Sequence, residues 1–514
     1  MDKIKFSSTI AGASIIITLS TLASKGLGFF REILFANYFG LGNEFDIYLV
    51  GAALPITINT IVFFIAQNYL IPIYHKKKSA QSVEAADDFI KLNIIIFFVF
   101  SLLFSLILYA FSNYIIKGYL GEVTPGVFST ARNVLLLFLI TIPLQTTFAV
   151  FANYLIAKFE YKHPALSNII VNLFVIIIII LTHKNLGIYS IAVGFIGGFI
   201  LQLIYIVAFS KIQLRFKNIS IYNLSYKNID STFYLIIIIE AITQLFILID
   251  RYFYTQVEPG GISAINYATT LYLLPISILA AGLSTALFPK FASAFSARNY
   301  PLLASYFKDG LANNLFLFIP VAVFLFFNSD LIVSVVYQRG QFTQANTTVT
   351  GDLLKIFAVS LVFYSTYAII NKFLYATDLL NKLVYISIAA LVIKIFLNFI
   401  LVGSYMQNGL AWASTISYSS MGILGIIFSV KIVRQKISLE IIKYFLIFTF
   451  TSFFCFWITS LSFSFLDMNN ITKIIIEPVV FGFLFISSTM ILGFNELASL
   501  KKITHSLQTI IRYF

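Results

Sequence analysis

Charged side chains within apolar segments are the residues of this sequence best suited to chemistry. Lys25, Arg31 and Glu32 lie in the first apolar segment, with Lys25 and Glu32 seven residues apart. On a helix this spacing brings Lys25 and Glu32 almost into line, while Arg31 projects about 120° away. Two interpretations fit. The charges form a local ion pair that closes a helix break at the glycine-containing step 26–28, or they line a central cavity that binds a phosphorylated or otherwise anionic substrate.

A second set of polar residues lies in two later apolar segments. Glu240, Gln244 and Arg251 fall within about 40° of one another around a helix. Lys394 and Asn398 are one turn apart in a segment that is otherwise apolar. An unpaired ammonium there would be very costly, so we expect Lys394 to pair with Glu240. The pair is either purely structural or a coupling site, where the ammonium replaces a transported cation or the pair takes up a proton. The predicted coupling residues are Glu240, Gln244, Lys394 and Asn398.

Fourteen stretches of the chain are long and apolar enough to cross a bilayer. A helix needs roughly 20 residues to cross a hydrocarbon core of about 30 Å, and a single helix satisfies its own backbone groups there. The sequence therefore predicts an all-α, polytopic membrane protein with about fourteen transmembrane helices. The predicted spans are 9–39, 46–74, 92–111, 127–157, 165–182, 188–209, 231–255, 263–289, 311–327, 350–371, 384–402, 409–430, 440–462 and 475–493.

Composition and charge support this assignment. The 514 residues are 59% hydrophobic and 11% charged, with a mean hydropathy of +0.93, and no region is polar enough for a sizeable soluble domain. The net charge of +13 is typical of membrane proteins that retain Lys and Arg on the cytoplasmic side, so we expect no nucleic-acid partner. With the N-terminus inside, the outer loops hold only four basic residues. This asymmetry predicts that both termini are cytoplasmic.

A weak internal repeat divides the predicted spans into two sets of six. The tripeptide Leu-Pro-Ile occurs at 54–56 and again at 274–276, and each copy lies in a span with a second proline near its end. Duplicated bundles are a common transporter plan, with the substrate site between the halves. We expect an N-terminal six-helix bundle at 1–210 and a C-terminal one at 211–435. Two additional transmembrane helices at 436–495 and a cytoplasmic interfacial helix at 496–514 follow.

No residue pattern points to catalysis or to a metal. The four histidines are scattered without ligand spacing, and the single cysteine, Cys455, cannot form an internal disulfide. The sequence has no GxxxxGK[ST] loop for a nucleotide phosphate. We therefore expect a transporter and not an enzyme. Catalytic residues, metal and cofactor are all expected to be absent, and the energy is expected to come from Na⁺, H⁺ or the membrane potential.

Four motifs, in order along the chain, resemble those of one transporter family. They are Ser24 to Glu32, then Tyr38-Phe39-Gly40 leading to Asp46, then Leu271 to Pro275, and then Tyr337 to Thr343. On a chain with fourteen predicted spans and cytoplasmic termini, they resemble the lipid II flippase family, often called the MurJ or MviN type. This family lies within the superfamily of multidrug, oligosaccharidyl-lipid and polysaccharide exporters. The resemblance runs through most of the length.

The resemblance implies a multi-pass flippase of the bacterial inner membrane. Two six-helix bundles would rock about a central cavity and move a polyprenyl-pyrophosphate-linked saccharide, either lipid II or an O-antigen or capsule unit, to the outer leaflet. The two additional helices would offer a groove for the lipid tail, and glycan-synthesis enzymes are the expected partners. The family's basic pair in the first span maps to Lys25 and Arg31, which would meet the pyrophosphate. Glu32, Asp46 and Arg251 complete the predicted substrate-binding set.

The chain departs from the family pattern at two places. Asn59 and Thr60 stand where paired arginines are usual, and Thr269 and Thr270 where Asp-Arg is usual. The predicted cavity has therefore lost basic residues, of which Arg251 would restore one. The departures leave lipid II and surface-polysaccharide units as equal candidates for the substrate.

Two other functions compete with a flippase. An ion-coupled multidrug antiporter of the same superfamily would have twelve spans and an acid-lined cavity, which the basic residues of the first span disfavour. A membrane-embedded glycosyltransferase or polymerase would carry catalytic residues in a large external loop. The longest outer segment, about 328–348, contains one acid, Asp330. For the rocking motion, the short glycine-containing turns at 40–44 and 259–261 are the predicted hinges.

Overall fold

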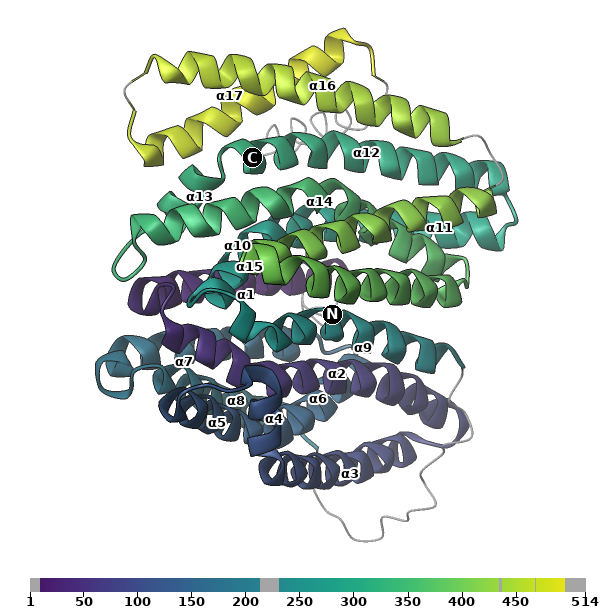
Figure 1. Ribbon diagram of the computed structural model, residues 1–514. Coiled ribbons are helices and arrows are strands. Elements are labelled where there is room, and N and C mark those ends of the chain that lie inside the picture. Colours follow the sequence, from purple (N-terminus) through teal and green to yellow (C-terminus); the bar gives the residue numbers. More distant parts are fainter. Residues whose placement is uncertain (1–9, 213–230, 434–436, 467, 495–514) are drawn as a thin grey trace. The chain divides into compact units, whose positions relative to one another are not determined.

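Helices are the only regular elements in the part of the chain that this computed structural model describes, residues 10–212, 231–433, 437–466 and 468–494 (Figure 1). This confirms the predicted all-α fold. The first half contains α1 (Ile10–Phe39), α2 (Asn43–Ala80), α3 (Val83–Ala110), α4 (Ser112–Leu120), α5 (Pro125–Leu139), α6 (Thr141–Ala157), α7 (Lys162–Leu186), α8 (Tyr189–Ser210), α9 (Ser231–Tyr252) and the 3-10 helix η4 (Tyr254–Gln256). The second half contains α10 (Gly261–Pro275), the π-helical turn η5 (Ile276–Ala280), α11 (Ala281–Ser296), α12 (Tyr300–Phe327), α13 (Ser329–Tyr337), α14 (Gln344–Ala376), α15 (Leu380–Val433), α16 (Ile437–Ser464) and α17 (Asn470–Ile491).

The described residues form two compact units. Unit 1 runs to Ser263 and also includes the segment Arg339–Phe342, and unit 2 contains the remainder from Ala264 onward. The division falls after α9 because α9 packs against α2. The predicted bundles divide earlier, at residue 210. The predicted bundles are parts of the chain that we expect to move together. Contacts within one conformation do not test this division, so it stays a prediction.

Twelve helices within the described ranges are long and apolar enough to cross a membrane. One of them, α15, has 54 residues, or about 80 Å at about 1.5 Å per residue, far more than one crossing needs. Its backbone is non-helical at Met406, where φ is 49°, so α15 contains both predicted spans 384–402 and 409–430. If these two are counted separately and α1, which carries the predicted first span, is added, the result is the predicted fourteen.

Local structure differs from the predicted spans at a few places. The helices α4 and α13, each of nine residues, occupy connections predicted as loops. The predicted span 127–157 is divided at Ile140 into α5 and α6. Hydropathy is averaged over a window of about 19 residues, so it detects neither a short helix nor a one-residue break. The predicted interfacial helix at 496–514 lies outside the described residues.

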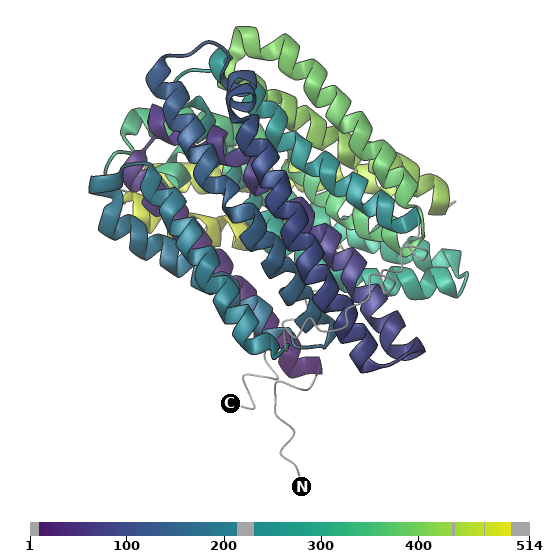
Figure 2. The same cartoon turned by 90° about the horizontal axis from the view of Figure 1, so that it is seen from below.

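Small residues bring the helices of unit 1 close together, as in the pair α7 and α8. Gly194 and Gly198 lie one turn apart on α8, and a Cβ atom on either would lie 3.2 Å from a Cα atom of α7, at Val175 or Val171. Lipid tails are as apolar as leucine, so close van der Waals contact drives helix association in a bilayer. Figure 2 shows the long helices of unit 1, in purple and blue, side by side.

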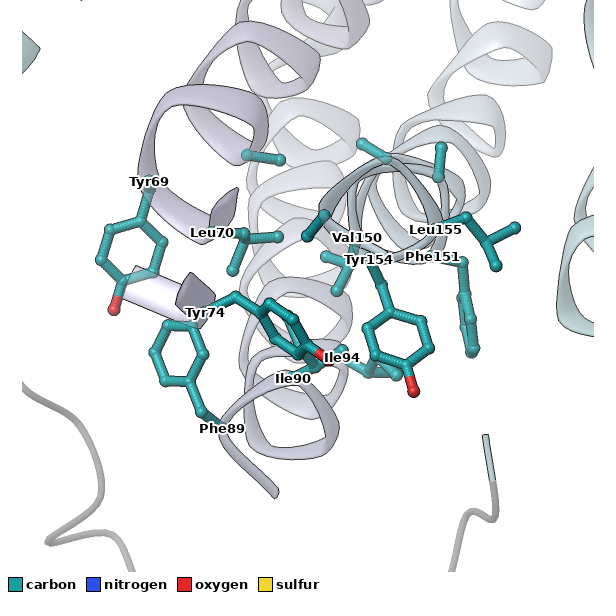
Figure 3. Close-up of a cluster of buried hydrophobic side chains, with 14 of the residues drawn as sticks. Tyr69, Leu70, Tyr74, Phe89, Ile90, Ile94, Val150, Phe151, Tyr154 and Leu155 are labelled. Atoms are coloured by element: carbon teal, nitrogen blue, oxygen red, sulfur yellow. The ribbon is translucent and has the colours of Figure 1, made fainter. Parts of the chain in front are cut away.

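A cluster of apolar side chains packs α2, α3 and α6 together where α2 ends and α3 begins (Figure 3). The rings of Tyr74 and Tyr154 are buried and meet edge to face, with centroids 5.9 Å apart. Phe89 of α3 is buried as well, and its ring centre lies 5.8 Å from that of Tyr69. Alanines among the members of this cluster allow the helix backbones to approach closely.

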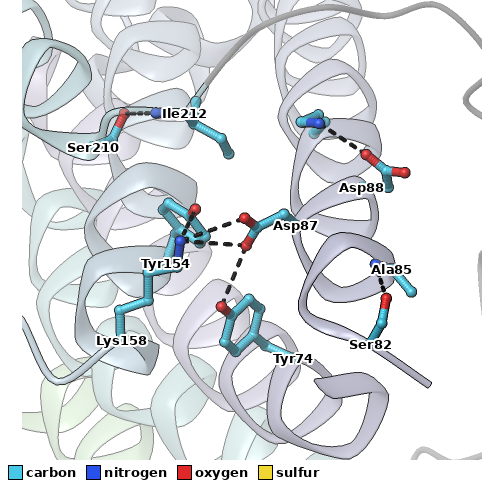
Figure 4. Close-up of polar contacts among 10 residues, drawn as sticks. Tyr74, Ser82, Ala85, Asp87, Asp88, Tyr154, Lys158, Ser210 and Ile212 are labelled. Atoms are coloured by element: carbon cyan, nitrogen blue, oxygen red, sulfur yellow. Dashed lines mark hydrogen bonds and ion pairs between the residues drawn. The ribbon is translucent and has the colours of Figure 1, made fainter. Parts of the chain in front are cut away.

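A polar network joins the same helices beside this cluster (Figure 4). Asp87 accepts a hydrogen bond from the Tyr74 hydroxyl at 3.3 Å and pairs with the Lys158 ammonium at 3.4 Å. The Lys158 ammonium also donates to the Tyr154 hydroxyl and lies 4.2 Å from the centre of that ring. Both charges have partners, so the network fits a structural role at this end of unit 1.

Candidate functional site

Groups on three helices hold Arg31, a predicted substrate-binding residue. Its guanidinium donates to Asn172 Oδ1 on α7 at 3.0 Å and forms an ion pair with Glu32 Oε1 at 2.7 Å. The guanidinium carbon lies 5.0 Å from the ring centre of Phe195 on α8 and 5.5 Å from that of Phe35. The buried Nε has no hydrogen-bond partner in the described chain. Arg31 is therefore a fixed cation whose Nε–H donor is still available.

The orientation of the Asn172 amide is set by its own hydrogen-bond donors. Nδ2 donates to the carbonyl oxygen and to Oγ of Ser24, both at 3.3 Å, and to the carbonyl oxygen of Asn168 at 3.1 Å. The amide oxygen is therefore the atom that faces Arg31. Sequence reasoning missed Asn172. The available signal was a pair of asparagines one turn apart, Asn168 and Asn172, in an apolar span.

The network continues from Asn168 into the interior of unit 1. Gln202 on α8 donates to Asn168 Oδ1 at 3.0 Å and accepts a hydrogen bond from Gln145 on α6 at 2.9 Å. Hydrogen bonds between amide side chains join transmembrane helices, because few other partners are present in the apolar phase. Arg31 on α1 is thus connected to α7, α8 and α6.

These contacts bear on the two interpretations of the first span. Glu32 makes a local ion pair with Arg31, its neighbour in the sequence. α1 continues as one helix through residues 26–28, so no break there needs to be closed. Lys25 is exposed, and its contact with a substrate stays a prediction.

The Asp46 carboxylate is held by hydrogen bonds from two residues near the start of α10. The Asp46 side chain is 0% exposed. Oδ2 accepts a hydrogen bond from the backbone N–H of Gly260 at 2.6 Å, and Oδ1 accepts from the backbone N–H of Ser263 at 2.6 Å and from the Ser263 hydroxyl. Because α10 begins at Gly261, the carboxylate lies at a helix N-terminus, where backbone donors and the helix dipole favour an anion. We name Asp46, Gly260 and Ser263 the clasp.

The clasp brings together the two turns predicted as hinges. Gly260 has φ of +88°, and a Cβ atom there would lie 2.4 Å from the carbonyl oxygen of Leu41, so the turn tolerates only glycine at this close approach. The Tyr254 hydroxyl donates to Asn43 Oδ1 at 2.7 Å. The turns at 40–44 and 259–261 are therefore in direct contact. In this conformation Asp46 is fully engaged by the protein itself, and its predicted substrate contact stays a prediction.

A third segment lies against the end of α1. The backbone N–H of Gln341 donates to the Asn37 carbonyl oxygen at 2.9 Å. Gly340 has φ of +56°, and a Cβ atom there would lie 2.3 Å from the same oxygen. The chain passes between unit 1 and unit 2 after Ser263 and around Arg339–Phe342. At both crossings, the chain is therefore hydrogen-bonded to residues near the end of α1 or the start of α2.

Arg251, the remaining predicted substrate-binding residue, is buried in the last turn of α9. The charges of Asp250 and Asp46 both act on its guanidinium. Its Nε is without a hydrogen-bond partner among the residues described. Arg251 therefore lies near the clasp, and its contact with a substrate stays a prediction.

The four predicted coupling residues divide between the two units. Glu240 is partly buried on α9 and accepts a hydrogen bond from Gln244 Nε2 at 2.8 Å, which confirms that these two share a helix face. Lys394 and Asn398 are buried on α15 in unit 2. A contact between Glu240 and Lys394 therefore stays a prediction.

An apolar groove of about 660 Å³ lies on the two additional helices, α16 and α17. Phe450 and Phe454 of α16 and Ile491 of α17 are among its lining residues, with Lys443 as its charged member. A groove with this lining suits a hydrocarbon chain. Within the described ranges, no group of three or more His, Cys, Asp and Glu residues is arranged to hold a metal ion.

The family model for Lipid II flippase MurJ matches residues 35–477. A probable lipid II flippase MurJ from Borreliella burgdorferi is 27% identical over 442 residues, which cover 84% of this chain and 85% of that relative.

Solved structures agree with the fold. A lipid II flippase MurJ in an inward closed conformation has a TM-score of 0.80 at 25% identity, and the match covers 93% of this chain and 98% of the other. A multidrug resistance MATE family transporter in an inward-facing conformation has a TM-score of 0.66 at 13% identity, covering 84% of this chain and 99% of the other. The second likeness concerns the fold alone.

Proposed function

Because this chain belongs to the lipid II flippase MurJ family, we propose that it translocates lipid II from the inner to the outer leaflet of a bacterial inner membrane. The match over residues 35–477 is the observation that carries the proposal, because it extends over nearly all the predicted spans. Lys25, Arg31 and Glu32 precede the matched residues. Their proposed roles rest on the first-span motif and, for Arg31, on the contacts described above.

Arg31 is the proposed contact of the pyrophosphate. A guanidinium presents several N–H donors in a plane that matches phosphate oxygens, and it remains charged at any physiological pH. In this structure, Glu32 supplies one negative charge and Asn172 one hydrogen-bond acceptor to the Arg31 guanidinium. A pyrophosphate carries more negative charge than Glu32, so it would displace Glu32 while Asn172 keeps the guanidinium in position. Lys25, exposed seven residues earlier on α1, would supply a second cation.

Alternating access is the proposed route, and it requires the contact between the turns at 40–44 and 259–261 to open and close. A sugar pyrophosphate cannot cross hydrocarbon unaided, so the head group would move through a polar cavity while the prenyl chain stays in lipid. The apolar groove on α16 and α17 is the proposed place for that chain. The positive-inside asymmetry supports cytoplasmic termini.

The proposed energy source is an ion gradient or the membrane potential, with Glu240 and Lys394 as the coupling pair. Removing one member of a buried ion pair typically costs about 3 to 5 kcal/mol, whereas removing both is milder. The double variant Glu240→Gln with Lys394→Met should therefore regain stability that either single variant loses. Transport by the double variant should lose its dependence on pH or on the potential. If that dependence is unchanged, the pair has no coupling role.

Complementation tests the substrate. The protein is expressed in a bacterium depleted of its own lipid II flippase, and growth is measured at matched membrane abundance. Wild-type protein should restore growth, and Arg31→Ala should not. The matched control is Lys91→Ala, because that ammonium pairs with Asp88 on α3, away from the site.

A second strain separates lipid II from other lipid-linked saccharides. Growth rescue of the lipid II flippase strain supports the proposal. Rescue only of a strain that lacks its O-antigen flippase would overturn lipid II as the substrate and favour a surface-polysaccharide unit. No specific observation favours a multidrug antiporter, since the likeness to that transporter concerns the fold.

A further inference from the structure

Glu477 is a buried acid on α17, one of the two additional transmembrane helices. Its side chain is 1% exposed, and Oε2 has no hydrogen-bond partner within the residues that the structure describes. Acids in membrane-spanning helices are rare because an uncompensated carboxylate is costly there, and those that occur commonly mark an ion or proton pathway. Glu477 is absent from the contacts of Arg31 and of the clasp, so its burial needs a separate explanation.

Two more buried polar atoms without partners lie on the element opposite. Asn328 joins α12 to α13, and Ser329 is the first residue of α13. Asn328 Nδ2 and Ser329 Oγ belong to side chains that are 8% and 0% exposed, and neither has a hydrogen-bond partner in the described chain. α17 packs against α12 and α13, and the Asn328 amide lies close enough to the Glu477 carboxylate to act on it, although Nδ2 and Oε2 do not complete a hydrogen bond. Native proteins leave few buried polar groups unsatisfied, so Glu477 and Asn328, with Ser329 next to Asn328 in the chain, indicate a site that takes up a further group.

The surroundings of these three side chains are aromatic. Phe481, one turn after Glu477, has its ring centre 6.1 Å from that of Phe324, which lies one turn before Asn328. The same ring lies 5.8 Å from Phe456 of α16. Aromatic rings offer a carboxylate no conventional hydrogen-bond donor, so the neighbouring packing does not compensate the charge.

Few charged groups face Glu477 from the neighbouring helices. Lys473 attracts it from one turn earlier on α17, yet Oε2 remains unpartnered. On α13, Asp330 pairs with Lys355 of α14 at 3.2 Å. Asp467, between α16 and α17, lies outside the described residues. The charged residues of α12 and α16 stand near the other ends of those helices, at Lys308, Asp309, Glu440 and Lys443.

We propose that Glu477, Asn328 and Ser329 bind a small cation, either a proton or a sodium ion, where α17 meets α12 and α13. Carboxylate, hydroxyl and amide oxygens are ligands that hard cations prefer, and a proton turns the carboxylate into a neutral hydrogen-bond donor. The Asn328 amide can present its oxygen or its nitrogen, because a half-turn of the amide exchanges them. The bound cation neutralises the charge that opposes burial. Attachment of α16 and α17 to α12 and α13 therefore depends on the cation.

Thermal unfolding of the purified full-length protein in detergent tests this site. The wild-type protein is titrated with sodium chloride against choline chloride at constant ionic strength and, separately, with acid. For a cation that binds only the folded state, each tenfold increase above its Kd multiplies the folded-to-unfolded ratio by about ten. A sodium site raises the unfolding temperature with Na⁺ at fixed pH. A proton site raises it on acidification at any Na⁺ concentration.

Two variants assign the response to Glu477. Glu477→Gln imitates the neutralised side chain, so it should unfold near the temperature of the cation-saturated wild type and respond to neither titration. Glu440→Gln is the matched control, since that carboxylate is exposed on α16 and pairs with Lys308 at 2.9 Å. It should keep the wild-type response. Equal responses of the wild type and Glu477→Gln to both cations would overturn the proposal.

A measurement on the wild type alone removes any dependence on how the variants fold. Hydrogen exchange of α17 is followed by mass spectrometry in Na⁺, in choline and at two pH values, after correction for the intrinsic pH dependence of exchange. The effective cation should slow exchange in α17 and leave α7, in unit 1, unchanged. Exchange in α17 that responds to neither cation would rule out the site.

Discussion

Asp46 and Glu477 are the two most buried carboxylates of the described residues, and their surroundings are opposite. Asp46 accepts three hydrogen bonds from Gly260 and Ser263. Glu477 retains an oxygen without a partner, opposite two further buried polar atoms that also lack one. Equal burial therefore serves two purposes. Asp46 closes a contact within the protein, whereas Glu477 retains the capacity to bind.

Asp46→Ala should give the largest effect, because it leaves the backbone donors of Gly260 and Ser263 buried without an acceptor. Hydrogen bonds to charged groups and unsatisfied buried donors are each worth roughly 1 to 3 kcal/mol, so we expect a loss of about 3 to 5 kcal/mol in the free energy of unfolding. Asp46→Asn should lose less, since it keeps one acceptor oxygen. Unfolding in detergent is the measurement. The control is Glu44→Ala, an exposed acid in the same turn, and equal losses in both would refute a structural role for Asp46.

Gly260→Ala should be the next most harmful change, and it tests the same clasp through its backbone. The added Cβ meets the Leu41 carbonyl oxygen at 2.4 Å, at a φ of +88° that L residues rarely adopt. We expect a loss of about 2 kcal/mol in the free energy of unfolding. Gly126→Ala is the matched control, since a Cβ atom there meets nothing within 4 Å. A Gly260→Ala protein as stable as the control would mean that the two turns separate without cost.

Asn172→Leu should reduce the free energy of unfolding by about 1 kcal/mol, because one charge-assisted hydrogen bond to Arg31 is lost. Its larger effect should be on transport, measured as the rate at which lipid II becomes accessible in the outer leaflet. Asn172→Asp separates positioning from stability. A second carboxylate beside Arg31 would preserve the fold but compete with a pyrophosphate, so transport should fall while the unfolding temperature does not. Full transport by Asn172→Asp would exclude Arg31 as the pyrophosphate contact.

Lys355→Ala should give the smallest effect, although it removes two ion pairs at once. Its ammonium lies 3.2 Å from Asp330 and 3.0 Å from Asp352, and both carboxylates are half exposed. Pairs of this kind contribute roughly 0.2 to 1 kcal/mol, and salt screens them. We expect a loss below about 1 kcal/mol that disappears at high salt. A loss as large as that of Asp46→Ala would show that burial is not what separates these carboxylates.

Hydropathy and short motifs were sufficient for the all-α fold and for most of the spans. The two spans within α15 were predicted separately although the helix is continuous except at Met406, because each has its own apolar length. The repeated Leu-Pro-Ile tripeptide shows a structural difference that these two signals do not predict. α2 runs through Pro55 as one helix, whereas α10 ends at Pro275 and the π-helical turn η5 follows. Proline has no backbone N–H, so it removes one helical hydrogen bond at both places. Packing against neighbouring helices then decides whether a π-helical turn forms.

The sequence alone established which residues are chemically unusual in a bilayer, because a charge within an apolar segment is visible from its neighbours. Arg31 was found in this way, whereas Asp46 was predicted from the family motif that ends at it. Only the tertiary structure decided their partners. Asp46 bonds to residues 214 and 217 positions away, and Arg31 to one 141 positions away. Glu477 was missed for the same reason, since whether a carboxylate in a span is satisfied depends on which helix faces it. Spans follow from local composition, but satisfaction of a buried charge is a property of contacts between distant segments.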